Sequence, residues 1–424
     1  MRRIVAAIGL AAGAGWAWLA GGTSLLGPAA SIALPIAAAL ATDRKSRFAA
    51  AAAYYLIGSS PIVGAVRGYW GPGHDLAGIG AWLAASAALA APWALASSAI
   101  GVVFAILATA LPPLGVIGWL SPLNAAGVLF PGTRLVGVIL LIGLLAAVAA
   151  VVSRRPLAPP VRHRLHAGIA GSAALSILLV AFAPTLQVPP GWAGVSTAVL
   201  PARGNMITEI RNNNAIIRSI TGQAPNAGVV AAPESVVDGW FPGTQQQFSH
   251  AVPAGQTWIL GVQADSKDAV YIVRPGKPPA KPVALAAGLL LGGDWIPSRA
   301  GSLTPAWWQR VFSINGKRVW AALCIEQVQP WTWMEAAIQR ADVVLAMTNS
   351  WWATTGNRAP DIQAASTRAW ARLLGAPVIL AENRSPSVSV APRRGWSWGA
   401  GSMDEATCCR GLVLRLLKQT IPVS

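Results

Sequence analysis

Three polar residues follow apolar runs that predict buried β-strands. Glu234 follows VVAAP, Cys324 lies within WAALCIE, and Asn349 follows VVLAMT. Strand ends and the loops beyond them are where α/β folds place reactive groups. A deprotonated cysteine is a capable nucleophile, and a carboxylate can accept the thiol proton. The three positions therefore indicate a cysteine nucleophile with a carboxylate base, and they place Asn349 at a neighbouring strand end.

Other interpretations of the cysteine remain open. Cys324 in an apolar strand can be an inert core residue, because free cysteine is often buried. A Cys–His protease would need a histidine partner, and residues 186–424 offer only His250. The four histidines form no HExxH, so neither a metal nor an organic cofactor is expected. Cys408 and Cys409 are adjacent, and three cysteines are too few for a disulfide framework.

The composition predicts a membrane region followed by a separate domain. The chain has 424 residues, of which 54% are hydrophobic and 11% charged, whereas about 25% charged is usual. Residues 1–185 hold 13 charged side chains and residues 186–424 hold 34. We therefore expect a multi-span α-helical membrane bundle over residues 1–185, a linker over 186–194 and an α/β domain over 195–424.

The apolar stretches predict seven membrane spans, since a span needs about 20 residues. They cover residues 4–22, 24–42, 48–66, 77–108, 114–130, 135–152 and 166–184. The fifth is short and rich in Gly and Pro, which leaves six as the alternative. Nine positive charges fall on one side of this arrangement. Basic loops stay in the cytoplasm, so we expect a bacterial inner-membrane protein with a cytoplasmic N-terminus and a periplasmic α/β domain.

The α/β domain is expected to alternate strands and helices, which is typical of a layered fold. The strands are predicted at 196–201, 228–232, 258–263, 269–273, 318–325, 342–348 and 377–381. The helices are predicted at 205–221, 333–340 and 362–374.

Longer motifs carry a resemblance to known families. The segments AAPES, AALCIEQ and LAMTNSWW, in that order, look like motifs of the nitrilase (carbon–nitrogen hydrolase) superfamily. With a membrane bundle in front, the chain resembles apolipoprotein N-acyltransferase. ALCIEQ, NSWWATTGN and QAASTRAWARLLGAPVIL are similar to the TraB family of conjugal transfer proteins from Agrobacterium and rhizobial plasmids. The resemblance implies an αββα four-layer sandwich and a role in plasmid conjugal transfer.

The resemblance also implies residue roles. Glu234 would be the general base and Cys324 the nucleophile that holds an acyl group as a thioester. A lysine would stabilise the oxyanion together with the backbone N–H of Ile325. Glu326 matches an acidic residue that supports the site, and Asp294 in GGDWIP resembles the second glutamate of a GEYVP stretch.

The lysine is the element that departs from the pattern. Lys281 is the first candidate and Lys277 the second, but the family spacing counted back from Asp294 leads to Ala286. If neither lysine enters the site, the domain is better explained as a retained fold without turnover. The sequence therefore leaves three alternative functions open. The chain is a catalyst, a non-catalytic scaffold of a transfer apparatus, or a true apolipoprotein N-acyltransferase.

The expected partners follow from charge and aromatic content. The net charge of +17 suggests nucleic acid, but nine basic residues lie in membrane loops, so direct nucleic-acid binding is not expected. Membrane lipid, a lipoprotein or envelope substrate with an amide or ester bond, and conjugal transfer proteins are the expected partners. The tryptophans between Trp295 and Trp352 would line an acyl-chain groove, rest at the membrane interface, or pack in the core.

Overall fold

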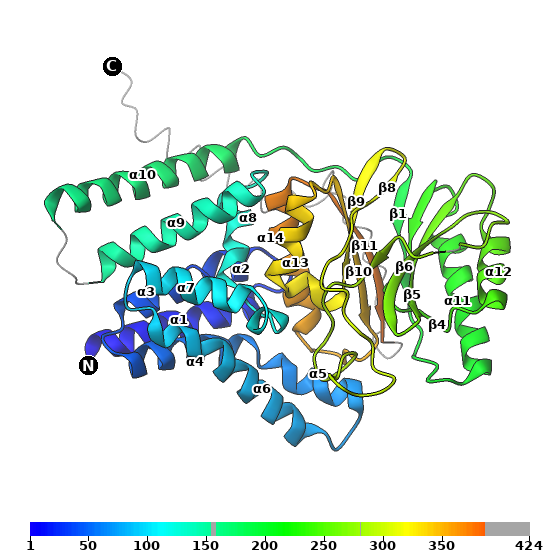
Figure 1. Ribbon diagram of the computed structural model, residues 1–424, viewed down its shortest axis with the longest axis horizontal. Helices are drawn as coiled ribbons and strands as arrows, with labels where there is room; N and C mark the ends of the chain where they lie inside the picture. Colours follow the sequence, from blue (N-terminus) through cyan, green and yellow to red (C-terminus); the bar gives the residue numbers. More distant parts are fainter. Residues whose placement is uncertain (154–157, 280, 386–424) are drawn as a thin grey trace.

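The computed structural model describes residues 1–153, 158–279 and 281–385; Cys408 and Cys409 lie outside these ranges. The first part of the chain is helical (Figure 1). Its α-helices are α1 (Arg2–Ala20), α2 (Leu26–Ala30), α3 (Ala33–Leu40), α4 (Arg44–Gly58), α5 (Pro61–Trp70), α6 (Asp75–Ala90), α7 (Ala99–Ala110), α8 (Ala125–Leu129), α9 (Leu135–Val152) and α10 (Pro159–Ala181). Three short 3-10 turns, η1 (Ala91–Leu95), η2 (Leu114–Val116) and η3 (Pro122–Asn124), lie between them.

Fewer helices are long enough to cross a membrane than the seven or six expected. Within the described residues, α1, α6 continued by η1, α9 and α10 qualify, and the pair α4 and α5, bent by 48°, makes a fifth if it counts as one span. The expected span at 24–42 is divided into α2 and α3, and the one at 114–130 into η2, η3 and α8. Proline and glycine interrupt both stretches, and proline removes a helical hydrogen bond. Apolar composition was therefore a poor guide to helix length here.

Two mixed sheets form the α/β part. The first has the strand order β1 (Trp192–Gly194), β3 (Val229–Ala231), β5 (Thr257–Ala264), β6 (Lys267–Val273) and β7 (Ala284–Leu285), with β4 (Val237–Asp238) also on β5. The second has the order β2 (Ser196–Thr197), β11 (Val378–Arg384), β10 (Val343–Ser350), β9 (Lys317–Leu323) and β8 (Phe312–Ile314). Strands β9, β10 and β11 run parallel to one another.

The two sheets pack face to face between helices. One buried cluster joins the facing sides, with Ile259 of the first sheet and Leu345 of the second among its members. Helices α11 (Met206–Gln223) and α12 (Pro242–Ala251) cover the outer face of the first sheet, and α13 (Pro330–Ile338) and α14 (Ala359–Leu374) cover that of the second (Figure 1). The sequence of layers is helix, sheet, sheet, helix.

The predicted α/β elements have counterparts close to where the sequence placed them. The antiparallel pair β5–β6, the helices α11 and α14, and strands β9 and β10 all lie within a few residues of the expected ranges. The expected linker at 186–194 is an exception, because Trp192–Gly194 forms strand β1 and pairs with β3. Helix α12 and strand β8 were not predicted, since both are short and lack a clear apolar period.

The helical bundle contacts the α/β part along α14. Gly127 of α8 lies so close to this helix that a Cβ built on it would be 1.6 Å from the carbonyl oxygen of Ala369. Ser366 Oγ donates to Asn124 Oδ1 at 2.8 Å, and Gln329 Nε2 donates to the carbonyl oxygen of Val116 at 2.6 Å. One apolar cluster continues from the bundle into α13 and α14. The two parts of the chain therefore share a core.

We expect Gly127→Ala to destabilise the protein by about 1–3 kcal/mol, the usual cost of overpacking. The new methyl group would meet backbone atoms of α14, which cannot rotate away. Thermal unfolding in detergent, followed by circular dichroism, measures the change. Gly143→Ala is the matched control, because nothing lies within 4 Å of a Cβ at that position of α9. Equal midpoints for both variants would contradict the tight contact between α8 and α14.

Candidate active site

Cys324 lies at the turn where β9 ends and a 3-10 turn, η4 (Cys324–Val328), begins. Its φ is 31°, in the left-handed region that non-glycine residues seldom adopt. Gln363 of α14 donates from its side-chain amide to the carbonyl oxygen of Cys324. Such strained positions persist where surrounding contacts hold them, and they cluster at functional sites. The strand end thus presents Cys324 in a fixed orientation.

Glu234 approaches this cysteine from the other sheet. It follows β3, is 6% exposed, and its carboxyl forms side-chain hydrogen bonds with Asp268 and with Cys324. Strand β5 passes so close that a Cβ on Gly261 would lie 2.4 Å from the Glu234 Cα. Burial raises the pKa of Glu234 well above its usual range, and the neighbouring Cys324 and Asp268 raise it further. The structure therefore brings the expected base and the expected nucleophile together.

Burial raises the pKa of Cys324 to about 11, and repulsion from Asp294 adds to this effect. The backbone N–H of Asn349 and the side chains of Glu234 and Gln363 partly oppose the rise. The thiol is accordingly protonated at neutral pH and needs a base to become a nucleophile. A buried carboxyl with a raised pKa is a stronger base near pH 7 than an ordinary glutamate.

Two further groups at the site were missed from the sequence. Asp268 of β6 is 2% exposed and accepts a hydrogen bond from Ser235 Oγ at 2.8 Å. Burial raises its pKa to about 6. Tyr69 of α5 donates to Asp294 Oδ1 at 2.8 Å, so the helical bundle contributes a side chain to the site. An aspartate inside the apolar run DAVYIV was a signal for Asp268, but nothing in the sequence linked Tyr69 to residues 225 positions away.

Glu326 is fully buried and holds two segments together. Its Oε2 accepts from the backbone N–H of Leu323 at 2.9 Å and from Gln309 Nε2 at 3.1 Å. Its Oε1 accepts from the N–H groups of Ala287 at 2.6 Å and Gly288 at 3.2 Å. Burial raises the pKa of Glu326, while these backbone N–H groups oppose the rise. The carboxyl fixes the end of β9 against the segment that follows β7.

Asn349 and Ile325 flank the cysteine. Asn383 Nδ2 donates to Asn349 Oδ1 at 2.8 Å, and Asn349 Nδ2 donates to the carbonyl oxygen of Ser235 at 3.4 Å. These contacts tie the ends of β10 and β11 to the segment that carries Glu234. Ile325 is partly buried at the start of η4, and its role as an oxyanion donor stays a prediction.

The expected lysine is not brought to this group. Lys277 and Lys281 are both exposed, and within residues 1–153, 158–279 and 281–385 neither forms an ion pair with Glu234 or another carboxylate. Ala286, where the family spacing would place the lysine, directly follows β7 and is 3% exposed. The site therefore differs from a Cys–Glu–Lys triad in the group that would stabilise an oxyanion.

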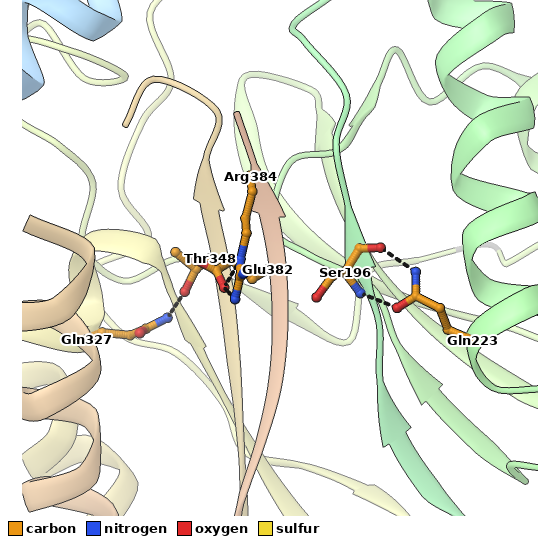
Figure 2. Close-up of polar contacts among 6 residues, drawn as sticks. All are labelled: Ser196, Gln223, Gln327, Thr348, Glu382 and Arg384. Atoms are coloured by element: carbon orange, nitrogen blue, oxygen red, sulfur yellow. Dashed lines mark hydrogen bonds and ion pairs between the residues drawn. The ribbon is translucent and has the colours of Figure 1, made fainter. Parts of the chain in front are cut away.

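A separate cavity of about 260 Å³ lies between β10, β11 and α14. Neither Glu234 nor Cys324 lines it, although Gln363 does. Figure 2 shows Gln327 reaching Thr348, with a hydrogen bond of 2.9 Å, and the pair formed by Glu382 and Arg384, whose charged atoms are 2.5 Å apart. Because its walls satisfy one another in this way, we do not assign the cavity to the reaction.

The tryptophans divide between core and surface. Trp320 and Trp333 are fully buried, whereas Trp307 and Trp308 are each 46% exposed. Trp307 meets Trp295 edge-on with 5.4 Å between ring centroids. The exposed tryptophans lie on the loop that follows Asp294.

The fold and the site define an apolar helical bundle joined to a two-sheet α/β unit that contains a buried acid–thiol site. No protein-family profile matches the chain. It is similar to the probable conjugal transfer protein TraB of Sinorhizobium fredii, at 26% identity over 387 residues, which are 87% of this chain and 94% of the relative. It is also 26% identical to the conjugal transfer protein TraB of Agrobacterium fabrum over 410 residues, 89% of this chain and 91% of the relative. Both likenesses extend over the helical and the α/β parts.

Proposed function

We propose that the chain is a membrane-anchored acyl-group hydrolase or acyltransferase of the nitrilase-like type, with Cys324 as its nucleophile. The observation that carries the proposal is the meeting of Cys324, at a strained strand end, with the buried carboxyl of Glu234 from the opposite sheet. Glu234 takes the thiol proton while sulfur bonds to the acyl carbon of an amide or ester. The amine or alcohol leaves with that proton, and water or an amine then releases the acyl group and restores the thiol.

We propose a role in plasmid conjugal transfer, acting on the cell envelope. Two relatives with that printed name support it, and each aligns with most of this chain. The proposed location is the bacterial inner membrane, with the N-terminus in the cytoplasm and the α/β domain in the periplasm. The nine positive charges on one side of the seven-span arrangement support this orientation. With five spans the α/β domain stays on the same side, but Arg44, Lys45 and Arg47 move to the opposite side from the N-terminus, which leaves six of the nine charges in the cytoplasm.

A second candidate function is favoured by one specific observation, the exposure of Lys277 and Lys281. Without an oxyanion-stabilising lysine, the domain would serve as a non-catalytic scaffold of the transfer apparatus. Apolipoprotein N-acyltransferase activity would require the same chemistry as the first candidate. Complementation of a strain depleted of apolipoprotein N-acyltransferase would test this activity directly.

The test of the proposed function is labelling of Cys324 by a neutral chloroacetamide in the full-length, detergent-solubilised protein. A background of Cys408→Ser and Cys409→Ser leaves Cys324 as the one thiol of the chain. We expect Glu234→Gln to slow labelling at pH 7 by about 100-fold, the lower range for loss of a general base. Intact-mass spectrometry at timed points gives the rates. Equal rates in both proteins would favour the scaffold.

The pH profile of the same reaction checks the direction of the pKa shifts. In the wild type, the rate should level off once Glu234 is ionised. In Glu234→Gln it should continue to rise toward pH 11, because burial raises the pKa of Cys324 to about that value. Superimposable profiles would show that Glu234 does not assist the thiol.

A further inference from the structure

The turn that carries Cys324 is held by side chains of two helices. Three carbonyl oxygens of η4 accept hydrogen bonds from α13 and α14. Thr332 Oγ1 and Trp333 Nε1 of α13 donate to two of them, at 3.0 and 3.2 Å. Gln363 of α14 donates from its side-chain amide to the third, the carbonyl oxygen of Cys324. Because a residue at a φ of 31° stays there only where its surroundings hold it, this contact bears directly on the orientation of the cysteine.

Gln363 is itself fixed from both sides. Its side chain is buried, and Thr367 Oγ1, one helical turn later, donates to its carbonyl oxygen at 3.0 Å and to Gln327 Oε1 at 2.9 Å. Gln327 Nε2 donates in turn to the carbonyl oxygen of Ala322 in β9 at 3.0 Å. The chain of hydrogen bonds therefore runs from α14 to the strand whose end carries Cys324.

The same amide also acts on the sulfur. Burial raises the pKa of the Cys324 thiol and repulsion from Asp294 adds to the rise, whereas the backbone N–H of Asn349 and the side chain of Gln363 oppose it. A hydrogen bond to the sulfur from a neutral N–H favours the thiolate. The contacts of Gln363 thus reach both the backbone and the side chain of the proposed nucleophile.

We propose that Gln363 is a positioning residue for the Cys324 nucleophile. Its amide holds the turn after β9 in the conformation that directs the thiol toward Glu234. This inference rests on the proposed function, in which Glu234 takes the thiol proton. A displaced thiol would lose its hydrogen bond with Glu234, so the base-assisted part of the reaction would be lost first.

Gln363→Met tests this role in the full-length protein with Cys408→Ser and Cys409→Ser, labelled by the neutral chloroacetamide. Methionine has nearly the length of glutamine but no N–H donor. We expect labelling of Cys324 at pH 7 to slow by about 10- to 100-fold, since misplacing a reacting group by about 1 Å has an effect of this size. Intact-mass spectrometry at timed points gives the rate, and thermal unfolding in detergent shows whether the variant is folded.

Gln256→Met is the matched control and should label at the wild-type rate. Gln256 is 6% exposed, as is Gln363, and its side-chain amide also donates to backbone carbonyl oxygens, those of Ala224 and Pro225 at the end of α11. Gln363→Asn keeps an amide but withdraws it by one methylene group, so it should slow labelling as well. It takes the place of Gln363→Met if that variant does not fold. Labelling at the wild-type rate would overturn the inference.

A pH profile in the Glu234→Gln background separates positioning from a general loosening of the turn. There the thiol ionises without a base, and Asp294 and Tyr69 are the remaining titratable groups beside it. Loss of the Gln363 donor should raise the pKa of Cys324 further, so labelling should be slower at each pH below about 11. A loosened turn would admit water and lower this pKa toward the ordinary range of cysteine. Faster labelling would therefore overturn the inference.

The inference and the proposed function fail in different ways. If Glu234→Gln slows labelling and Gln363→Met does not, the inference is overturned and the proposed function stands. If Glu234→Gln labels at the wild-type rate while Gln363→Met slows labelling, the support of the sulfur by Gln363 stands and the proposed function is overturned.

Discussion

Replacing Cys324 by alanine should reduce plasmid transfer to the level of a strain that lacks the gene, while the protein still accumulates in the membrane. The sulfur is the only atom at the site that can hold an acyl group as a thioester. Alanine fits the strand end without adding volume, so the two packed sheets should remain intact. The measurement is the number of transconjugants per donor, compared with immunoblots of the membrane fraction.

The matched control is the double substitution Cys408→Ser and Cys409→Ser, which removes two thiols that have no part in the proposed reaction. We expect transfer to stay near the wild-type frequency with this variant. If Cys324→Ala also transfers at the wild-type frequency, catalysis is not needed, and the α/β unit acts as a scaffold. A fall in transfer with unchanged membrane levels would instead direct the search toward amide and ester substrates.

Glu326→Gln should destabilise the protein by about 2–5 kcal/mol, although glutamine has nearly the same shape. Glu326 accepts from four donors, two at each oxygen. An amide has one accepting oxygen, so its NH₂ group must face a pair of donors and leave them unpaired. Each buried, unsatisfied donor costs about 1–3 kcal/mol. The affected donors include the N–H of Leu323, so the turn that presents Cys324 should loosen as well.

Thermal unfolding in detergent and the neutral-probe labelling rate of Cys324 measure the two effects together. We expect a midpoint lowered by several degrees and a slower Glu234-dependent reaction. Asp265→Asn is the control, since Asp265 is exposed in the β5–β6 turn at a φ of 50°, which asparagine adopts readily. If Glu326→Gln has the unfolding midpoint and the labelling rate of the wild type, the hydrogen bonds accepted by Glu326 are not needed to hold the turn after β9.

The order of elements in the α/β part followed from local signals. Short apolar runs bounded by turn residues predicted strands β5, β6, β9 and β10, because such strands are buried on both faces and read as continuous hydrophobic segments. Helix α14 followed from its amphipathic period. The short strands at the sheet edges, such as β1 at Trp192–Gly194, have too few residues to show a period. Their pairing depends on the neighbouring strand.

Apolar composition predicted that the first part of the chain is suited to a membrane, but not how many helices cross it. The stretches at 24–42 and 114–130 are as hydrophobic as their neighbours, yet proline and glycine divide them into short helices. Of those pieces, α2, η3 and α8 pack against α14 of the α/β part, and Gly127 of α8 lies directly against Ala369. Helix length is set by backbone hydrogen bonds that hydropathy does not report.

The sequence by itself determined the chemical types at the site: a cysteine and a glutamate, each at the end of an apolar strand. The tertiary structure decided which groups surround them. It placed Asp268 and Tyr69 there and left Lys277 and Lys281 at the surface. The physical reason is that residue type and strand position are local properties. A charge balance within a few ångströms depends on segments more than 200 residues apart, which only packing brings together.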